Sequence, residues 1–108
     1  MSWDWETIPQ YYDALDRRLG VNVACFVGHS AVRRYVMQDA AYDRQATAEE
    51  MERMIAILRG GMEAGALGIS FERNRRHVDL EGRPIPTNVA SERNCLSWPA
   101  GWVGWARA

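Results

Sequence analysis

The chain has 108 residues, which is enough for one small domain with a modest hydrophobic core. Hydrophobic residues make up 47% of it and charged residues 25%, a globular composition that argues against intrinsic disorder. The net charge of -1, from 13 basic and 14 acidic residues, gives no overall field that would attract nucleic acid or an anionic membrane.

The first predicted elements are a helix and a buried strand. Residues 7–19 carry apolar side chains at helical spacing, with Pro9 in the first turn and Gly20 where a C-terminal cap belongs. Residues 21–27 are a nearly continuous apolar run, as in strands that are buried on both faces of a sheet. Because such strands belong to parallel sheets, this run predicts an α/β fold.

A short helix and a loop are expected next. Gly28, His29 and Ser30 end the apolar run, and Ser30 is placed to cap a helix that runs to about Met37. The polar character of residues 38–46 then predicts a loop.

The strongest signal in the sequence is a helix over about residues 48–64. Thr47 and Glu50 have the spacing of a capping box, and apolar residues recur behind them at helical spacing. Gly60 and Gly61 weaken this helix near its end by roughly 1 kcal/mol each relative to Ala.

Gly65 is placed to end that helix, and residues 67–70 predict a second short strand. Strand, helices and strand in this order form a right-handed parallel crossover, the unit of α/β barrels and doubly wound sheets. A unit of two strands has two open sheet edges, which further repeats would normally cover. We therefore expect an incomplete sheet and a marginal fold, because a small core offsets chain entropy poorly.

Polar residues follow both predicted strands, and in parallel α/β folds the carboxyl ends of the strands carry function. We expect His29 and the loop from Arg73 to His77 to lie on the same side of the sheet. His29 is either a hydrogen-bonded structural residue, the commoner case, or a metal ligand or proton carrier. Arg73, Arg75 and Arg76 either form a solvated loop or bind a carboxylate or phosphate through forked hydrogen bonds.

The segment after this loop carries turn signals. Glu81 and Gly82 predict a turn, and Pro84 and Pro86 predict an extended or irregular stretch.

The sequence offers no convincing metal site of its own. A catalytic zinc site needs about three protein ligands, usually His or carboxylate. The chain has two histidines, His29 and His77, which follow different strands, and it has no lysine that could form a carbamylated bridge. We therefore expect no catalytic residues and no bound metal in the isolated chain.

The expected compartment is the cytoplasm. The N-terminus lacks the positive region of a signal peptide, and no apolar run approaches the roughly 20 residues that cross a bilayer. Cys25 lies in an apolar run, where a buried thiol is the commoner state, so we expect Cys25 and Cys95 to remain unpaired.

An ordered series of segments carries a family resemblance over about residues 3–90. The segments are Trp5-Glu6-Thr7 to Tyr12, Asn22 to Gly28-His29, Val32-Arg33 to Val36-Met37, Ala46-Thr47 to Met54, and Met62-Glu63-Ala64-Gly65-Ala66-Leu67-Gly68-Ile69-Ser70. Together they resemble the amidohydrolase family, in its N-acyl-D-amino-acid deacylase type. Phe71-Glu72-Arg73-Asn74 with Arg76-His77, Gly82 and Pro84-Ile85-Pro86 is similar to one branch of that family.

This resemblance implies a distorted (β/α)₈ barrel with metal ions, zinc in the parent family, that activate water to attack an N-acyl carbonyl. The family's ligands come from an early His-x-His strand, a Cys or carbamylated Lys, later histidines and a late Asp, and none of them maps onto this chain. Residues 1–90 would thus be an internal fragment of the barrel domain, inactive alone. At the barrel mouth Arg73, Arg76 and His29 would be the candidates for contact with a small N-acyl amino acid.

The family pattern stops after Ala90, where it would continue as a helix. Pro99 would break such a helix, and three of the five Trp residues fall between residues 98 and 108. Read two nucleotides further on, Asn94-Cys95 always gives Leu, and one choice of synonymous codons turns the sequence from Ser91 into Arg-Ala-Glu-Leu-Leu-Glu-Leu-Ala-Arg. Our hypothesis is that residues 91–108 are a divergent tail produced by a frameshift.

A second hypothesis of a different class stays open. The chain could be a small anion-binding or protein-interaction module that uses the loop from Arg73 to His77 for anions and its open sheet edges for a partner chain.

Overall fold

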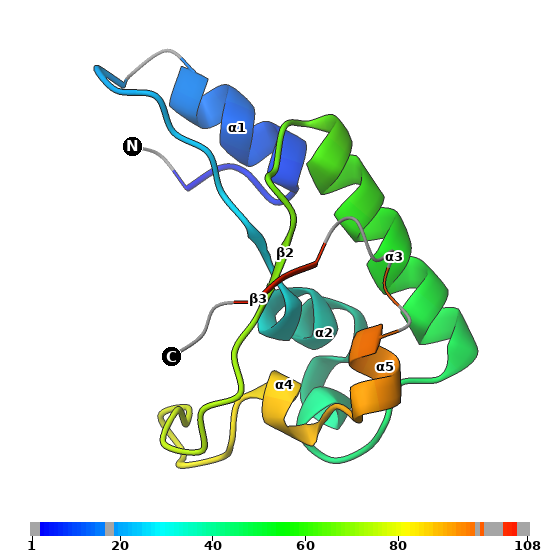
Figure 1. Ribbon diagram of the computed structural model, residues 1–108. Coiled ribbons are helices and arrows are strands. Elements are labelled where there is room, and N and C mark those ends of the chain that lie inside the picture. Colours follow the sequence, from blue (N-terminus) through cyan, green and yellow to red (C-terminus); the bar gives the residue numbers. More distant parts are fainter. Residues whose placement is uncertain (1–2, 17–18, 97, 99–102, 106–108) are drawn as a thin grey trace.

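The computed structural model describes residues 3–16, 19–96, 98 and 103–105. Helices α4 and α5 and the loop after β2 lie at one end of the molecule, and α1 lies at the other (Figure 1). In chain order the elements are α1 (Ile8–Asp16), β1 (Val27–Gly28), α2 (His29–Met37), the 3₁₀ helix η1 (Gln38–Tyr42), α3 (Ala48–Glu63), β2 (Ile69–Phe71), α4 (Pro86–Val89), α5 (Glu92–Leu96) and β3 (Val103–Trp105).

The centre of the fold is a three-stranded parallel sheet in the order β1-β2-β3. β1 pairs with β2 in parallel, with Val27 opposite Ile69, and the chain passes between them through α2, η1 and α3. Two backbone hydrogen bonds continue this pairing, from Val27 N to Gly68 O at 2.8 Å and from Leu67 N to Cys25 O at 3.0 Å. The expected parallel strand-helix-strand crossover is confirmed.

The first strand is much shorter than the sequence indicates. The prediction over residues 21–27 is wrong for most of its length, because β1 comprises only Val27 and Gly28. Val21 is 71% exposed and Phe26 is 53% exposed, so this stretch is not covered on both faces as the apolar run suggested. The second strand, predicted over residues 67–70, lies one to two residues later, at Ile69–Phe71.

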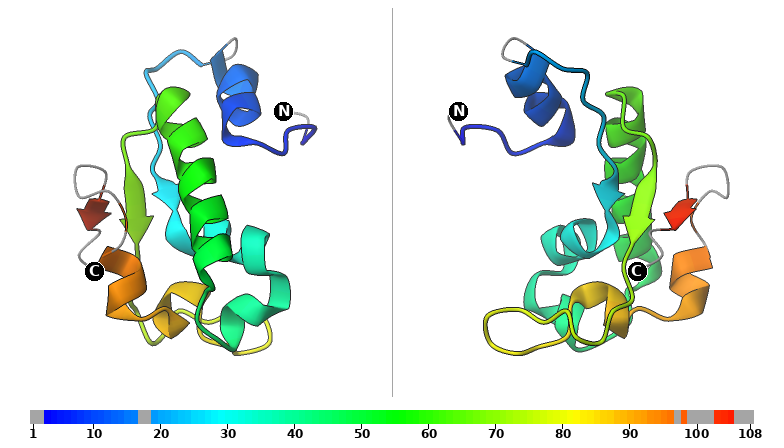
Figure 2. Two further views of the ribbon diagram at one scale, coloured as in Figure 1. Left: turned by 90° about the vertical axis from the view of Figure 1, so that its right-hand side faces the viewer. Right: turned by 60° about the vertical axis from the view of Figure 1, so that its left-hand side comes forward.

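The third strand was not expected. β3 pairs with β2 in parallel, with Ile69 opposite Val103 and Phe71 opposite Trp105. One edge of β2 that the sequence left open is therefore covered by the segment after Ala90, and Figure 2 shows this strand beside β2 on the side away from β1. The expectation of a two-stranded sheet was wrong because strand pairing between distant segments has no local sequence signal.

The ends of the helices follow the sequence in part. α1 begins at Ile8 and is described to Asp16, while Arg17 and Arg18 of the predicted helix lie outside the described residues. α2 begins at His29 with Gly28 as its N-cap and no side-chain cap, so the capping role predicted for Ser30 is wrong.

Further along, residues 38–46 are a loop only in their second half, since η1 occupies Gln38–Tyr42. Pro86 opens α4, whereas an extended or irregular segment was expected. Proline suits this position because the first turn of a helix needs no donor there.

The capping box of α3 is confirmed. Thr47 Oγ1 accepts from Glu50 N at 3.2 Å, and Glu50 Oε2 accepts from Thr47 N at 2.8 Å. After the helix ends at Glu63, Gly65 takes a positive φ of 106°, which is a conformation that favours glycine.

The core lies between the sheet and helices α2 and α3. The buried apolar side chains come from these elements, from η1, from the loop before β2 and from the segment after α4; they are Val27, Val32, Val36, Met37, Ala41, Met54, Leu58, Ala66, Ile69, Phe71, Ala90, Cys95 and Trp98. Cys25 and Cys95 are free thiols.

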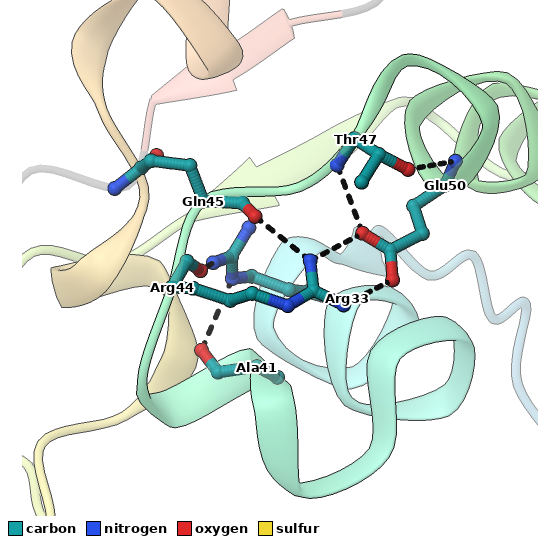
Figure 3. A network of polar contacts seen from close by, with 6 residues as sticks. All are labelled: Arg33, Ala41, Arg44, Gln45, Thr47 and Glu50. Atoms are coloured by element: carbon teal, nitrogen blue, oxygen red, sulfur yellow. Dashed lines mark hydrogen bonds and ion pairs between the residues drawn. The ribbon is translucent and has the colours of Figure 1, made fainter.

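A polar network anchors the connection between α2 and α3 (Figure 3). The Arg33 side chain is fully buried and donates from Nε to Ala41 O at 3.2 Å and from Nη2 to Arg44 O. Arg44 in turn makes a two-pronged ion pair with Glu50, at 2.8 and 2.7 Å. By binding these carbonyl groups, Arg33 holds the segment after α2 in place. Burial lowers the pKa of its guanidinium.

Candidate functional site

The carboxyl ends of β1 and β2 meet at one side of the sheet, as the sequence predicts. β1 leads directly into His29, and β2 leads into the loop that carries Arg73 and His77. Because the two strands are parallel neighbours, both segments leave the sheet together, and His29 lies against Phe71 with 4.7 Å between ring centroids. The structure therefore brings His29 and the base of this loop into one region.

His29 is a core residue in this region. It is 1% exposed, its Nδ1 lies 2.8 Å from Thr87 Oγ1, and the Trp98 ring covers it edge-on at 5.6 Å. Its Nε2 is buried with no hydrogen-bond partner among the described residues. This environment is that of the hydrogen-bonded structural histidine, since a ligand has no open path to the ring.

The surroundings of His29 also determine its charge. Burial, together with the nearby guanidinium groups of Arg33 and Arg73, lowers its pKa from 6.5 to about 4. The imidazole is therefore neutral at pH 7. A neutral ring packed against Phe71 and Trp98 fits an apolar core.

Thr87 links His29 to α4. Its hydroxyl lies 2.6 Å from Ser30 Oγ as well as 2.8 Å from His29 Nδ1, and Thr87 N donates to Ser30 Oγ at 3.2 Å. The hydroxyl of Ser30 is thus engaged with α4 and does not cap α2. These contacts join segments that are 57 and 58 residues apart, and sequence reasoning did not identify Thr87.

The Arg73 side chain is held in place by the segment after α4. Its Nη2 donates to Ala90 O at 2.9 Å and lies 3.5 Å from Cys95 Sγ. Arg76 is exposed, and its backbone N donates to Asn74 Oδ1 at 3.0 Å. His77 is also exposed and lies 2.8 Å from the Glu72 carboxylate.

A pocket of about 520 Å³ opens beside this loop. It is lined by Arg73, Arg75, Pro84, Asn88 and Val89. Of the arginines considered from the sequence, Arg73 and Arg75 therefore line a common space and Arg76 does not. Asn88 carried no sequence signal, because it reaches the pocket only through the position of α4.

A second pocket, also of about 520 Å³, lies between α1 and the sheet. Ile8, Tyr12, Phe26, Val27 and Val32 are among its lining residues. The Tyr12 hydroxyl accepts a hydrogen bond from Cys25 N at 3.0 Å, and both residues line this pocket. The walls are largely apolar.

The described residues do not fit a metal centre by themselves. Within them, no three His, Cys, Asp or Glu side chains come together in a way that could hold a metal ion. The His29 ring packs against Phe71 and Trp98, and its buried Nε2 has no hydrogen-bond partner in the described part of the chain.

Comparison with known proteins identifies the family. The model of the amidohydrolase family matches residues 1–103. This chain belongs to the amidohydrolase family. A curated D-aminoacylase from Alcaligenes xylosoxydans xylosoxydans is 43% identical over 70 residues, which are 64% of this chain and 14% of the relative.

Solved amidohydrolase structures show the same relationship. Three D-aminoacylase structures match with a TM-score of 0.64 and 33% identity, over 83% of this chain and 17% of theirs. One was studied for the functional role of its binuclear metal centre, and another is a mutant in complex with CuCl₂. The resemblance to D-aminoacylases is thus confirmed, and the chain spans only a small part of the length of these relatives.

The family match extends past Ala90, where the sequence indicated that the family pattern stops. The match continues to residue 103, so it includes α5 and reaches β3.

Among the described residues, no helix is both long enough and apolar enough to cross a bilayer.

Proposed function

We propose that this chain is a section of a metal-dependent amidohydrolase that hydrolyses the amide bond of N-acyl-D-amino acids, and that it is inactive alone. The observation that carries the proposal is the 43% identity to a D-aminoacylase over 70 residues. The 0.64 TM-score to D-aminoacylase structures supports the accompanying proposal that the parallel crossover is part of a (β/α)₈ barrel. The proposed substrate is a small molecule and the proposed location is the cytoplasm.

The role proposed for this chain is to form part of the rim of the active site. In the complete enzyme, a water molecule bound to zinc would have a pKa well below that of bulk water. We assign no step at that metal to the described residues, because they do not gather a ligand set. We propose that the described residues position the loop after β2. His29 contacts Phe71 at the start of this loop and Thr87 in α4.

The three candidate residues for substrate contact differ in their exposure and in their position relative to the pocket. Arg73 lines the pocket beside the loop, so we propose that it faces the substrate. His29 is 1% exposed, so we propose that it supports the loop and does not touch the substrate. Arg76 is exposed outside that pocket, and a role for it would require the substrate to extend along the loop.

An activity assay tests the proposed inactivity. The purified chain should show only background hydrolysis of N-acyl-D-amino acids with added zinc. A second version, in which the sequence from Ser91 is changed to Arg-Ala-Glu-Leu-Leu-Glu-Leu-Ala, should also stay at background, because the change adds no metal ligand. Metal-dependent turnover by the original chain would show that it holds a functional metal site.

We further propose that residues 1–90 derive from the barrel and that residues 91–108 are a frameshifted tail. The concentration of tryptophan in this segment and the Leu forced by Asn94-Cys95 support the proposal. The nucleotide sequence around and beyond the codon for Ala90 tests it. A reading frame that continues into a leucine-rich helix after a shift of two nucleotides is expected, and its absence would contradict the frameshift.

A second candidate function is a small anion-binding or protein-interaction module. The pocket lined by Arg73 and Arg75 favours anion binding, because two guanidinium groups share one space there. Saturable anion binding by a well-folded monomer would support this function.

A further inference from the structure

The pocket beside the loop after β2 brings together groups of different chemistry. Arg73 and Arg75 supply positive charge, Asn88 supplies an amide, and Pro84 and Val89 supply apolar wall. Its volume of about 520 Å³ lies within the range of roughly 300 to 1,000 Å³ that is common for small-molecule sites. A few polar groups that converge on a partly apolar space are typical of a binding site.

The Arg73 guanidinium is fixed before any ligand arrives. The hydrogen bond from Nη2 to Ala90 O and the contact with Cys95 Sγ hold one side of the group. Its Nε and Nη1 donors have no partner among the described residues, so they are available for an oxygen ligand. A fixed guanidinium loses little side-chain entropy on binding, which favours a bidentate carboxylate contact.

A turn separates Arg75 from Arg76. His77 N donates to Asn74 O at 3.0 Å, and Arg76 N donates to Asn74 Oδ1 at 3.0 Å, so Arg75 and Arg76 occupy the two central positions of this turn. Arg75 lines the pocket and Arg76 does not. The Glu72 carboxylate, which precedes Arg73 in the sequence, lies 2.8 Å from His77 Nδ1.

Asn88 supplies the complementary acceptor. Its Nδ2 donates to Asn74 O at 2.9 Å, which ties α4 to the turn, and its Oδ1 accepts no hydrogen bond within the described part of the chain. The pocket therefore presents cationic donors for a carboxylate, one acceptor for an N–H group, and apolar surface from Pro84 and Val89. An N-acyl amino acid carries a carboxylate, an N–H group and apolar substituents.

We infer that this pocket binds an N-acylated amino acid, with Arg73 and Arg75 on its carboxylate and Asn88 Oδ1 on its amide N–H. The choice of ligand rests on the proposed function, whereas the placement of the carboxylate rests on the pocket alone. The inference replaces Arg76 by Arg75 among the residues that contact the ligand.

The test is ligand-observed NMR titration of the full chain with N-acetyl-D-methionine, at low protein concentration to limit aggregation. Arg75→Gln should weaken binding at least about tenfold, because it removes a charge-assisted hydrogen bond. Arg76→Gln is the matched control on the same turn and should change binding less than about twofold, as expected for an exposed charge outside the pocket. Both side chains are exposed, so neither variant should alter the circular dichroism spectrum.

Two ligand analogues separate the contacts. The C-terminal carboxamide should show no binding, and the ester analogue with oxygen in place of N–H should bind more weakly than the parent. Equal losses in both variants, or equal binding of the carboxamide, would overturn the inference. So would binding of inorganic phosphate that is as tight and equally sensitive to Arg75→Gln, because the pocket would then be a simple anion site.

The enantiomers distinguish this inference from the proposed function. Equal binding of N-acetyl-D-methionine and N-acetyl-L-methionine would leave the pocket assignment intact and count against a D-specific substrate. If neither enantiomer binds, the pocket assignment is overturned, while the family membership and the activity assay are unaffected.

Discussion

His29 shows how position within the fold decides the role of a single residue. From the sequence it was either a structural residue or a ligand at the end of a strand. In the structure its ring packs against both Phe71 and Trp98, which also contact each other, and its Nδ1 is paired with Thr87. Its low pKa is a consequence of this burial, and it gives a measurable signature.

The free energy of unfolding should therefore decrease as the pH is lowered from about 6.5 to about 4. In this window the unfolded state binds a proton at His29 that the folded state does not, so acid favours unfolding. The loss should total up to about 3 kcal/mol, since each unit of pKa difference corresponds to about 1.4 kcal/mol. Urea unfolding across this pH range measures it.

Two histidine variants serve as controls for this prediction. His29→Gln should flatten the pH dependence in this window, whereas His77→Gln, at an exposed position, should retain it because His29 is still present. A His29→Gln protein with the same slope as the parent would show that other groups cause the acid sensitivity.

Trp98 covers His29 and Phe71 in the same cluster. It is 2% exposed, with ring centroids 5.6 Å from His29 and 6.2 Å from Phe71. Trp98→Ala should destabilise the fold by about 3 kcal/mol or more, as other large aromatic truncations in cores do. Trp98→Phe should cost less, because it keeps an aromatic ring and removes an indole N–H that has no partner among the described residues. Chemical denaturation of both variants tests this, and equal stability of Trp98→Ala and the parent would exclude Trp98 from the core.

At the scale of one element, α3 contains two adjacent glycines with opposite roles. A Cβ on Gly60 would meet nothing within 4 Å, whereas a Cβ on Gly61 would lie 2.9 Å from Val27 Cγ2 and 3.0 Å from Ile8 Cδ1. Gly61 thus allows α3 to approach both β1 and α1. The sequence presented both glycines only as weak points of the helix.

This difference predicts opposite effects of the same substitution. Gly60→Ala should stabilise the protein by up to about 1 kcal/mol through helix propensity. Gly61→Ala should destabilise it by about 1 kcal/mol net, because the clash with the stiff Val27 side chain outweighs the same gain in propensity. Thermal unfolding of the pair measures both. A Gly61→Ala protein as stable as Gly60→Ala would mean that α3 does not pack closely on β1.

At the scale of the whole molecule, apolar surface is left uncovered around β1. β1 is an edge strand of the described sheet. Four apolar side chains near it are between 44% and 71% exposed: Val21, Val23, Phe26 and Leu67. Large exposed apolar side chains beside an open strand favour association between molecules. β3 covers the other edge of β2, but it does not shield this one.

We therefore expect the isolated chain to be marginally stable and to aggregate as its concentration rises, so the stability comparisons above require dilute protein. Near-ultraviolet circular dichroism and thermal unfolding at several protein concentrations test this expectation. A sharp transition from a soluble monomer, independent of concentration, would contradict it.

Features that depend on neighbouring residues were determined by the sequence itself. The capping box of Thr47 and Glu50, the stop at Gly65 and the body of α3 involve contacts within a few positions, so their pattern predicts them. The parallel crossover also followed from the order of its elements, and the ordered segments were enough to indicate the amidohydrolase family.

Features that join distant segments were decided only by the tertiary structure. The pairing of β3 with β2, the bond from His29 to Thr87 and the meeting of Arg73, Arg75 and Asn88 around one pocket leave no local pattern. The length of β1 was overestimated for a related reason, since an apolar run shows the tendency to be buried, while actual burial requires a neighbouring element to cover it. Contact between residues far apart depends on the packing of the whole chain, which periodicity and spacing do not encode.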